Sequence, residues 1–154
     1  MFTQYIDSPL GSIRIEANDV GITAIAFVTT AEQSSRRSTL TQLAATQLQD
    51  YFDGKLTRFS MPLAASGTAF QQQVWQALCE IRFGDTCSYA AVANQLNNPK
   101  AVWAVGAANG RNPIAIVVPC HRVIGANGTL TGYAGGLDKK AWLLKHEQRQ
   151  QALL

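Results

Sequence analysis

The sequence predicts an α/β protein in two parts: an N-terminal β-sheet domain with a helix, followed by a mainly helical C-terminal domain that contains a helix-turn-helix. Two observations support this fold class. Apolar and polar residues alternate in the first third of the chain, as in half-buried strands, whereas apolar residues recur at helical spacing after position 66. The linker-like run 64–67 places the boundary between an N-terminal domain, residues 1–65, and a C-terminal domain, residues 66–154.

The N-terminal domain is expected to begin with a β-hairpin. Residues 12–16 alternate in polarity after a turn at 9–11, and residues 21–28 have the character of the partner strand. A helix is predicted over 39–52, because its apolar residues share one face. Asp53-Gly54 ends that helix, since glycine readily adopts the conformation that terminates one.

The C-terminal domain begins with a predicted helix over 68–81. A short helix over 88–96 and another over 99–108 follow, with Pro99 well suited to the first helical position. Two short helices joined by a tight turn have the outline of a helix-turn-helix. Many helical hairpins of this kind bind nothing, so the outline alone leaves DNA binding open.

The net charge of +3 is divided unevenly along the chain. Residues 1–65 carry five basic and six acidic side chains, a balance of −1, whereas residues 66–154 carry eight basic and four acidic ones, a balance of +4. This excess indicates a polyanionic partner such as nucleic acid, or equally a merely basic solvated surface.

Three cysteines in 154 residues do not suggest a disulfide framework. An odd and sparse count suits the reducing cytoplasm, where we expect the protein to work as a monomer. Neither the cysteine spacing nor the two histidines suggest a zinc site, so no metal is expected. The longest apolar runs are too short to span a bilayer, and the first residues do not resemble a signal peptide.

Cys120 is the candidate nucleophile. It follows the apolar run 114–118, which we interpret as a buried extended segment, and it stands directly before His121 and Arg122. A thiol must lose its proton to attack carbon, and a neighbouring imidazole and guanidinium both favour the thiolate. A lone cysteine is more often a small buried hydrophobic residue, but this setting favours a reactive one.

The run Pro119-Cys120-His121-Arg122-Val123-Ile124 resembles the active-site signature of the O6-alkylguanine-DNA alkyltransferases, also called methylated-DNA–protein-cysteine methyltransferases. The resemblance covers about residues 68–147. Its further landmarks, in chain order, are residues 70–75, 88–89, 98–101, 104–106, 132–137 and 143–147. Residues 1–65 agree with that family's N-terminal domain in length and character but carry no comparable motif.

The resemblance implies a DNA repair protein, a methylated-DNA–protein-cysteine S-methyltransferase that acts once and needs no cofactor. A guanine flipped out of duplex DNA gives its O6 alkyl group to Cys120. His121 is implied as the base, acting through an ordered water, with Glu147 orienting it. Tyr89 is expected to donate to guanine N3. Asn112 is expected at a hinge near the thiol, a role that can coexist with ordinary Asn-Pro turn chemistry.

The guanine pocket and the DNA-binding helix are also implied by the resemblance. The loop 132–136 is expected to line the pocket, with the Ala134 backbone N–H reaching O6 and the carbonyls of Cys120 and Val123 reading the exocyclic amine. Small residues on the second helix allow close approach to the minor groove, although they suit tight helix packing equally well. The residues expected to contact substrate or DNA are Ala101, Trp103, Ala104, Arg122, Val123, Tyr133, Ala134 and Gly135.

Two features of this part of the chain stand outside the family pattern. Trp103 occupies the position where family members usually carry an arginine that fills the space left by the flipped base. It either acts as an intercalating wedge or packs internally. For Lys139-Lys140 we expect a solvated helix face, with an approach of Lys140 to the loop 132–136 as the alternative, and His146 has no motif role.

Three competing interpretations remain. A non-catalytic damage sensor related to the family would lack the reactive cysteine, which this chain retains. A plain helix-turn-helix regulator leaves the Cys120-His121 pair and Glu147 unexplained. A cysteine hydrolase is disfavoured because sequence-adjacent Cys and His point differently from the usual spatial pair. We expect double-stranded DNA containing O6-alkylguanine as the partner, with no membrane and no obligate protein partner.

Overall fold

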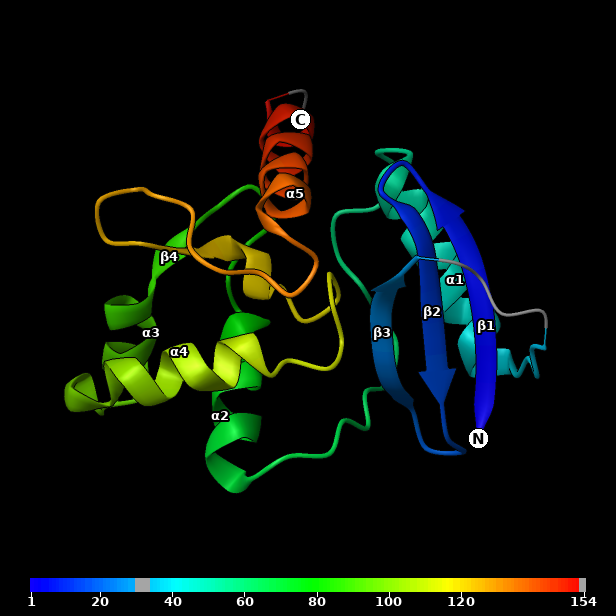
Figure 1. Cartoon of the computed structure of the whole chain (residues 1–154), viewed down its shortest axis with the longest axis horizontal. Helices are drawn as coiled ribbons and strands as arrows, with labels where there is room; N and C mark the ends of the chain where they lie inside the picture. The colour runs from blue at the N-terminus through cyan, green and yellow to red at the C-terminus, as the bar shows by residue number, and fades with distance from the viewer. Residues whose placement is uncertain (30–33, 153–154) are drawn as a thin grey trace. The chain divides into compact units, whose positions relative to one another are not determined.

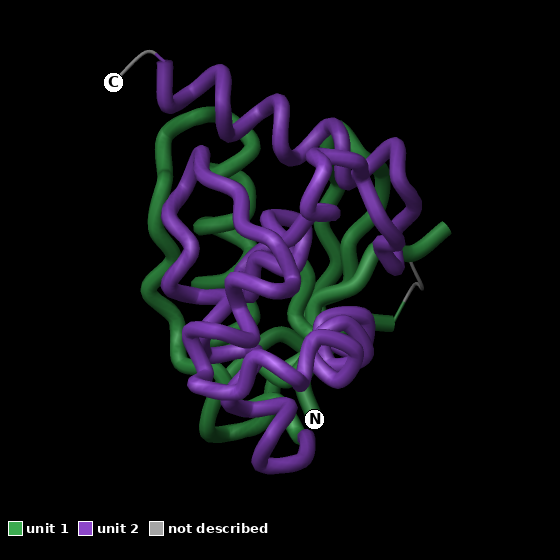
Figure 2. The backbone as a smooth tube through the Cα atoms, turned by 90° about the vertical axis from the view of Figure 1, so that its left-hand side faces the viewer, with its two compact units in different colours: residues 1–66, 113–115 green, residues 67–112, 116–154 purple. Residues whose placement is uncertain are grey.

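The computed structural model describes residues 1–29 and 34–152. The chain folds as two units, which Figure 2 colours separately. Unit 1 consists of Met1–Ser66 with Pro113–Ala115, and unit 2 consists of Gly67–Asn112 with Ile116–Leu154. The predicted fold class is confirmed, because a sheet with one helix forms unit 1 and helices dominate unit 2.

Unit 1 is a three-stranded antiparallel sheet, ordered β1 (Phe2–Ser8), β2 (Gly11–Ala17) and β3 (Ile22–Val28), with the helix α1 (Thr39–Phe52) against it (Figure 1). The predicted hairpin is therefore β2–β3. The alternation that identifies β2 arises because its inward-facing isoleucines are buried and the residues between them are partly exposed. The β1 strand, which was not predicted separately, pairs with β2 along its whole length.

The predicted helix over 39–52 is confirmed as α1. Its N-terminus is fixed by a capping box, in which Ser38 accepts from the Thr41 backbone N–H and the Thr41 side chain accepts from the Ser38 N–H. Its buried face, which includes Ala44, Leu48 and Tyr51, covers the sheet.

The segment 113–115 joins unit 1 by two backbone hydrogen bonds to β3. The Ile25 N–H donates to the Pro113 carbonyl at 3.0 Å, and the Ala115 N–H donates to the Ile25 carbonyl at 3.0 Å. The prediction of an extended segment over 114–118 is thus wrong beyond Ile114. The chain turns at Ile116, whose φ of +71° is unusual for a β-branched residue. The segment is buried as predicted, but it is a turn.

Unit 2 contains four α-helices, two 3₁₀ turns and a small parallel sheet in its described part. They are α2 (Ala69–Leu78), β4 (Cys87–Ser88), α3 (Tyr89–Gln95), η1 (Pro99–Ala101), α4 (Val102–Gly110), η2 (Cys120–Arg122), β5 (Val123–Ile124) and α5 (Leu137–Gln151). The helix predicted over 68–81 ends at Leu78, because the backbone then tightens into the turn that carries Ile81. The helix predicted over 99–108 begins as η1 and continues as α4.

The predicted helix-turn-helix is formed by α3 and α4. Ser88 caps α3 by accepting from the Ala91 N–H, and the chain then turns at Asn97, which has a φ of +56°. The Trp75 indole of α2 donates to the Ala108 carbonyl at 2.9 Å, within the last turn of α4. A buried indole that satisfies a helix-terminal carbonyl fixes α4 against α2.

Within the described residues, no helix combines the length and the apolar character needed to cross a membrane.

Candidate active site

The short parallel pairing of β4 with β5 brings two distant parts of unit 2 together. Cys87 pairs with Val123 and Ser88 pairs with Ile124. Tyr89 begins α3 immediately after β4, and η2, which holds Cys120, ends where β5 begins. The backbone register therefore holds the α3 N-terminus beside the turn that carries the candidate nucleophile.

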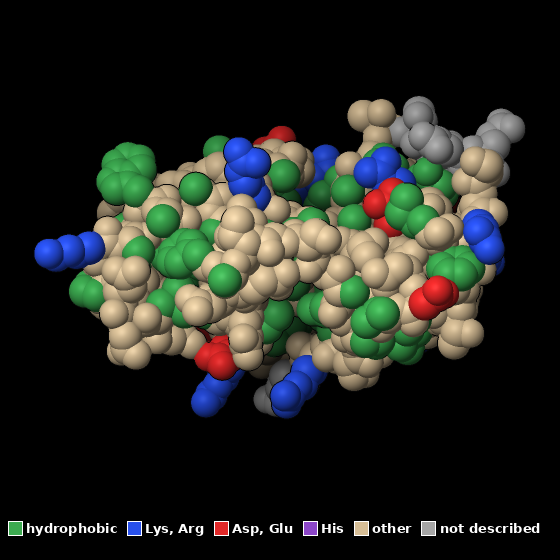
Figure 3. Space-filling model, turned by 90° about the horizontal axis from the view of Figure 1, so that it is seen from below, with side chains coloured by type: hydrophobic (Ala, Val, Ile, Leu, Met, Phe, Trp, Pro, Cys, Tyr) green, Lys and Arg blue, Asp and Glu red, His purple; other side chains and the backbone are tan. Residues whose placement is uncertain are grey.

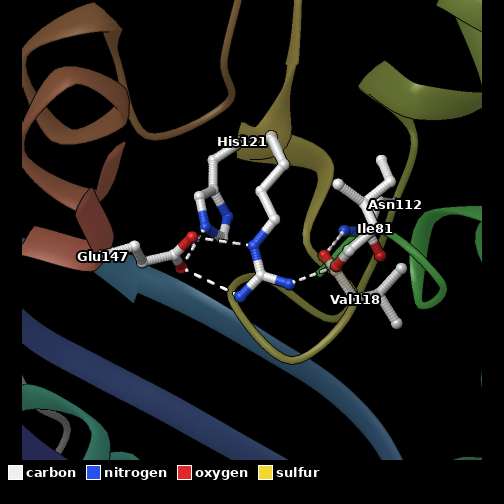
Figure 4. Close-up of polar contacts among 6 residues, drawn as sticks. Ile81, Asn112, Val118, His121 and Glu147 are labelled. Atoms are coloured by element: carbon white, nitrogen blue, oxygen red, sulfur yellow. Dashed lines mark hydrogen bonds and ion pairs between the residues drawn. The ribbon is translucent and has the colours of Figure 1, made fainter. Parts of the chain in front are cut away.

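His121, Arg122 and Glu147 form a buried ionic cluster (Figure 4). The Glu147 Oε2 lies 2.6 Å from the His121 Nε2, and its Oε1 accepts from the Arg122 Nε at 2.7 Å. The Arg122 guanidinium makes a second bond to the Glu147 Oε2 at 3.1 Å and donates through Nη1 to the Ile81 carbonyl at 2.7 Å. His121 has no exposed surface and Glu147 is 1% exposed. Every contact in this cluster is thus shielded from solvent.

Charge and burial fix the protonation states in this cluster. Burial opposes ionisation of Glu147, but the hydrogen bond from His121 and the hydrogen bonds and positive charge of Arg122 lower its pKa to about 2. Burial lowers the pKa of His121, with partial opposition from Glu147. At neutral pH the carboxylate is therefore ionised and the imidazole neutral.

The tautomer of His121 follows from these states. An ionised carboxylate can only accept, so the His121 Nε2 carries the proton. The other ring nitrogen, Nδ1, is buried and has no hydrogen-bond partner among the described residues. A neutral imidazole with an unoccupied lone pair is suited to act as a base.

The thiol of Cys120 is 7% exposed and is not poised as a thiolate. Burial raises its pKa, with partial opposition first from the Asn112 side chain and then from the charge of Lys140. The expectation that His121 and Arg122 favour the thiolate is therefore wrong for the resting protein. His121 is neutral and Arg122 is paired with Glu147. The thiol needs a base to react.

Asn112 lies at the turn between α4 and the active site. Its Nδ2 donates to the Val118 carbonyl at 2.8 Å (Figure 4), which closes the segment from Asn112 to Val118 into a loop. The same side chain favours the ionised thiol of Cys120. Both expected features of Asn112, a hinge position and proximity to the thiol, agree with this geometry.

Two basic side chains lie elsewhere than expected. Arg122 is 6% exposed and its guanidinium is bound within the ionic cluster, so it cannot contact DNA directly. Lys140 has no exposed surface, so the expectation of a solvated residue is wrong and the alternative, an approach to the loop, agrees with the structure. Its Nζ donates to the Val123 carbonyl at 2.7 Å and to the Thr131 carbonyl at 2.9 Å. His146 is also buried and stacks on Trp142 with ring centroids 4.8 Å apart.

Tyr89 lies beside Thr131, which directly precedes the loop 132–136 that is expected to line the guanine pocket. The phenol oxygen of Tyr89 lies 2.6 Å from the Thr131 Oγ1, and either oxygen can be the donor. Tyr133 is partly buried, and burial places its pKa well above 10.0, with a further rise from Cys120 and Glu147. Ala134 is exposed and Gly135 is half-buried. Sequence reasoning missed Thr131, which no motif distinguishes.

The α4 helix presents a surface of small residues and one large apolar side chain. Trp103 is 92% exposed, so the alternative that it packs internally is wrong. Ala104 and Ala107 are exposed, whereas Ala108 is buried and serves packing. On the face in Figure 3, apolar side chains lie among uncharged atoms and scattered basic side chains, and acidic ones are few. This character suits a nucleic acid better than a cationic partner.

The described residues contain no group of three or more His, Cys, Asp or Glu side chains arranged to hold a metal ion.

Two family models cover nearly the whole chain. The model described as 6-O-methylguanine DNA methyltransferase, DNA binding domain, matches residues 69–149, and the model described as the ribonuclease-like domain of the same proteins matches residues 1–65. The chain is 46% identical over 154 residues to the methylated-DNA–protein-cysteine methyltransferase of Methanosarcina barkeri, with 96% of this chain and 98% of the relative covered. It is 47% identical over 150 residues to the protein of that name from Mycobacterium leprae, with coverages of 94% and 91%.

Solved structures show the same likeness. The crystal structure of Mycobacterium tuberculosis OGT in complex with DNA superposes with a TM-score of 0.89 at 43% identity, covering 97% of this chain and 94% of that one. The crystal structure of Mycobacterium tuberculosis O6-methylguanine methyltransferase gives a TM-score of 0.88 at 42% identity, with coverages of 97% and 93%.

Proposed function

The chain belongs to the 6-O-methylguanine DNA methyltransferase family, and on that premise we propose that Cys120 takes the alkyl group from O6 of a guanine flipped out of duplex DNA. The protein is a methylated-DNA–protein-cysteine methyltransferase that repairs DNA by transferring the methyl group to its own cysteine. A thioether is a poor leaving group, so each molecule acts once. We further propose that the guanine is flipped out of the duplex, that the protein binds in the minor groove, and that individual residues have the roles given below.

The His121 Nδ1 supports this chemistry most strongly. Glu147 holds Nε2–H, and Nδ1 has no hydrogen-bond partner in the described part of the chain, so its lone pair is available for a proton. Because burial keeps the imidazole neutral, the base is in its active form at neutral pH. His121 takes the Cys120 proton through an ordered water. Glu147 stabilises the resulting imidazolium.

The transfer is a displacement at the alkyl carbon. The sulfur of Cys120 forms a bond to that carbon as the bond from carbon to guanine O6 breaks, and the electron pair leaves with the purine. Tyr89 donates its phenolic proton to N3, so the base departs as neutral guanine. The proton held by His121 then reprotonates the Tyr89 phenolate. Protons and charge balance over the cycle.

The guanine pocket is proposed from the loop 132–136 and two backbone carbonyls. The Val123 carbonyl already accepts from Lys140, but a carbonyl has two lone pairs and can also accept from an exocyclic amine. The exposed Ala134 offers its backbone N–H to O6, and Tyr133 and Gly135 complete the lining.

The α4 surface is proposed as the part that enters the minor groove. The half-buried Ala101 and the exposed Ala104 and Ala107 allow close approach to the sugar–phosphate backbone. Trp103 projects from this surface, and its indole stacks in the space that the flipped base vacates. Trp103→Ala is expected to weaken duplex binding by about 1–3 kcal/mol, the range for one lost aromatic–base stack. Equal affinity and transfer rate for Trp103→Ala, Trp103→Arg and the parent would contradict the wedge.

A reducing cytoplasm is the proposed location, and a monomer the proposed state. Cys79, Cys87 and Cys120 are all free thiols, and a nucleophilic cysteine is preserved where thiols remain reduced. Sedimentation of the reduced protein with and without DNA tests the monomer.

The deciding experiment is an intact mass after incubation with a duplex that carries O6-methylguanine. We expect a gain of one methylene, located on Cys120 by peptide mapping and absent in Cys120→Ala. Unmodified protein bound tightly to the lesion would instead identify a damage sensor. Replacing His121 with Gln keeps a polar side chain of similar reach without a base, and transfer is expected to fall about 100-fold or more.

A further inference from the structure

Thr131 joins two residues of the active site through two different atoms. Its hydroxyl Oγ1 lies 2.6 Å from the Tyr89 Oη, and its backbone carbonyl accepts from the Lys140 Nζ at 2.9 Å. Lys140 also donates to the Val123 carbonyl at 2.7 Å. Thr131 thus contacts the start of α3 and the buried lysine of α5, and through that lysine it is connected to β5.

The Lys140 contact gives Thr131 a fixed position. Lys140 has no exposed surface, and a buried ammonium is costly unless its donors are satisfied. The two groups that accept from its Nζ are backbone carbonyls, one in β5 and one in the loop. The loop carbonyl cannot move away without leaving a buried charged donor unsatisfied, so Thr131 is held beside Tyr89.

We propose that Thr131 is a positioning residue. It does not contact the substrate, but it directs the phenolic proton of Tyr89 toward the departing purine. The inference rests on the proposed function, in which Tyr89 donates to guanine N3. It adds the residue that determines where that proton points.

The chemistry of two neighbouring hydroxyls supports this role. Each can donate or accept, and the pair shares one hydrogen. When the Thr131 hydroxyl donates to the phenol oxygen, the phenolic hydrogen is left for the substrate. A phenol that accepts one hydrogen bond is also a better donor of the next, since linked hydrogen bonds polarise one another. Valine at this position has the same shape but cannot take part.

The test compares three variants of the loop. Thr131→Val removes the hydroxyl and keeps the carbonyl that Lys140 holds, whereas Thr131→Ser keeps both. Thr129→Val is the matched control, because the Thr129 hydroxyl donates to the Asn127 side chain on the exposed part of the same loop. The single-turnover rate of methyl transfer is expected to fall about threefold to tenfold in Thr131→Val, the value of one hydrogen bond. It should recover in Thr131→Ser and remain unchanged in Thr129→Val.

Two further measurements separate positioning from a structural effect. The rate at which iodoacetamide alkylates Cys120 requires neither guanine nor Tyr89, so Thr131→Val should leave it unchanged. In a Tyr89→Phe background, Thr131→Val should cause no further loss of transfer, because its effect passes through the phenol. Additive losses, or an equal fall in the iodoacetamide rate, would overturn the proposal.

The same data show which idea fails. If the parent protein reacts with iodoacetamide but takes no methyl group from O6-methylguanine duplex, the proposed function is wrong. If the parent transfers normally and Thr131→Val transfers equally well, only the role of Thr131 is wrong.

Discussion

The interiors of the two units differ in kind. In unit 1 the fully buried large side chains are mostly aliphatic, as at Ile15, Ile25 and Leu48, and the buried polar ones in its described part are uncharged. Unit 2 buries Lys140 together with the ionic cluster of His121, Arg122 and Glu147. Apolar burial stabilises a fold directly, whereas buried charges at best offset the cost of leaving water. The charged interior is therefore best explained by the chemistry it supports.

The largest effect that this comparison predicts is that of Glu147→Gln. The amide cannot balance Arg122, so a buried cation is left unpaired. The free energy of unfolding is expected to fall by about 3–5 kcal/mol, the range for breaking a buried ion pair. Urea unfolding at pH 7 measures it. The control is Asp138→Asn, an exposed residue in the first turn of the same helix, which should cost no more than about 1 kcal/mol.

The next largest effect should be a loss of stability in acid, which arises from the charged interior of unit 2. The folded protein lowers the pKa of Glu147 from 4.5 to about 2, so its contribution is complete above pH 4.5 and is lost as the pH falls toward 2. That lowering corresponds to about 3 kcal/mol. His121 acts in the same direction from about pH 6.5 downward, because its folded pKa is also lowered. Urea midpoints in the parent should fall across this range, and the fall should be smaller in Glu147→Gln. An identical acid dependence in both would contradict the assignment.

Lys140→Met is expected to have a smaller effect. Methionine keeps most of the stem and leaves the Val123 and Thr131 carbonyls without a donor, which costs about 1–3 kcal/mol. The relief of a buried charge offsets part of that cost. Unfolding in urea gives the stability, and hydrogen exchange of the loop should report faster opening. Lys145→Met, on the exposed side of α5, should change neither measurement.

The smallest effect should come from the aliphatic interior. Ile15→Val removes one methylene from the central strand and should cost about 0.5–1.5 kcal/mol. The loss should be the same at pH 7 and pH 5, because no titratable group takes part. If the loss of unfolding free energy in Ile15→Val varied with pH, the proposed difference between the two interiors would be contradicted.

Periodicity in the sequence was sufficient for the β2–β3 hairpin and for α1, since each has a regular apolar pattern. The helical pair was instead predicted from the tight turn and from Pro99 at the start of the second helix. Cys120 and His121 could be identified because they are adjacent and chemically distinctive. Glu147 followed only from the family resemblance. Its contact with His121 spans 26 residues of sequence and depends on how α5 packs.

Other parts of the site could not be predicted because local pattern gives the wrong answer or none. Lys140 stands beside Lys139 on a helix, where charged pairs are usually solvated, and its acceptors lie in another part of the chain. Arg122 diverges from Cys120 because a 3₁₀ turn has about three residues per turn. Trp103 lies in a helix whose residues are nearly all small and apolar, so no polar face indicates which side meets solvent.

The composition of α4 has a consequence for the minor-groove contact that we propose for this helix. Residues Val102–Gly110 include no charged side chain, and only Lys100 and Arg111 flank them. Counterions leave the duplex in proportion to the phosphates that cations neutralise, so this helix releases few of them. Its share of the binding free energy stays nearly constant as ionic strength rises. Basic side chains elsewhere carry the salt-sensitive share. As the salt concentration rises, nonspecific binding along the duplex is therefore expected to weaken before the proposed contact of this helix with the minor groove does.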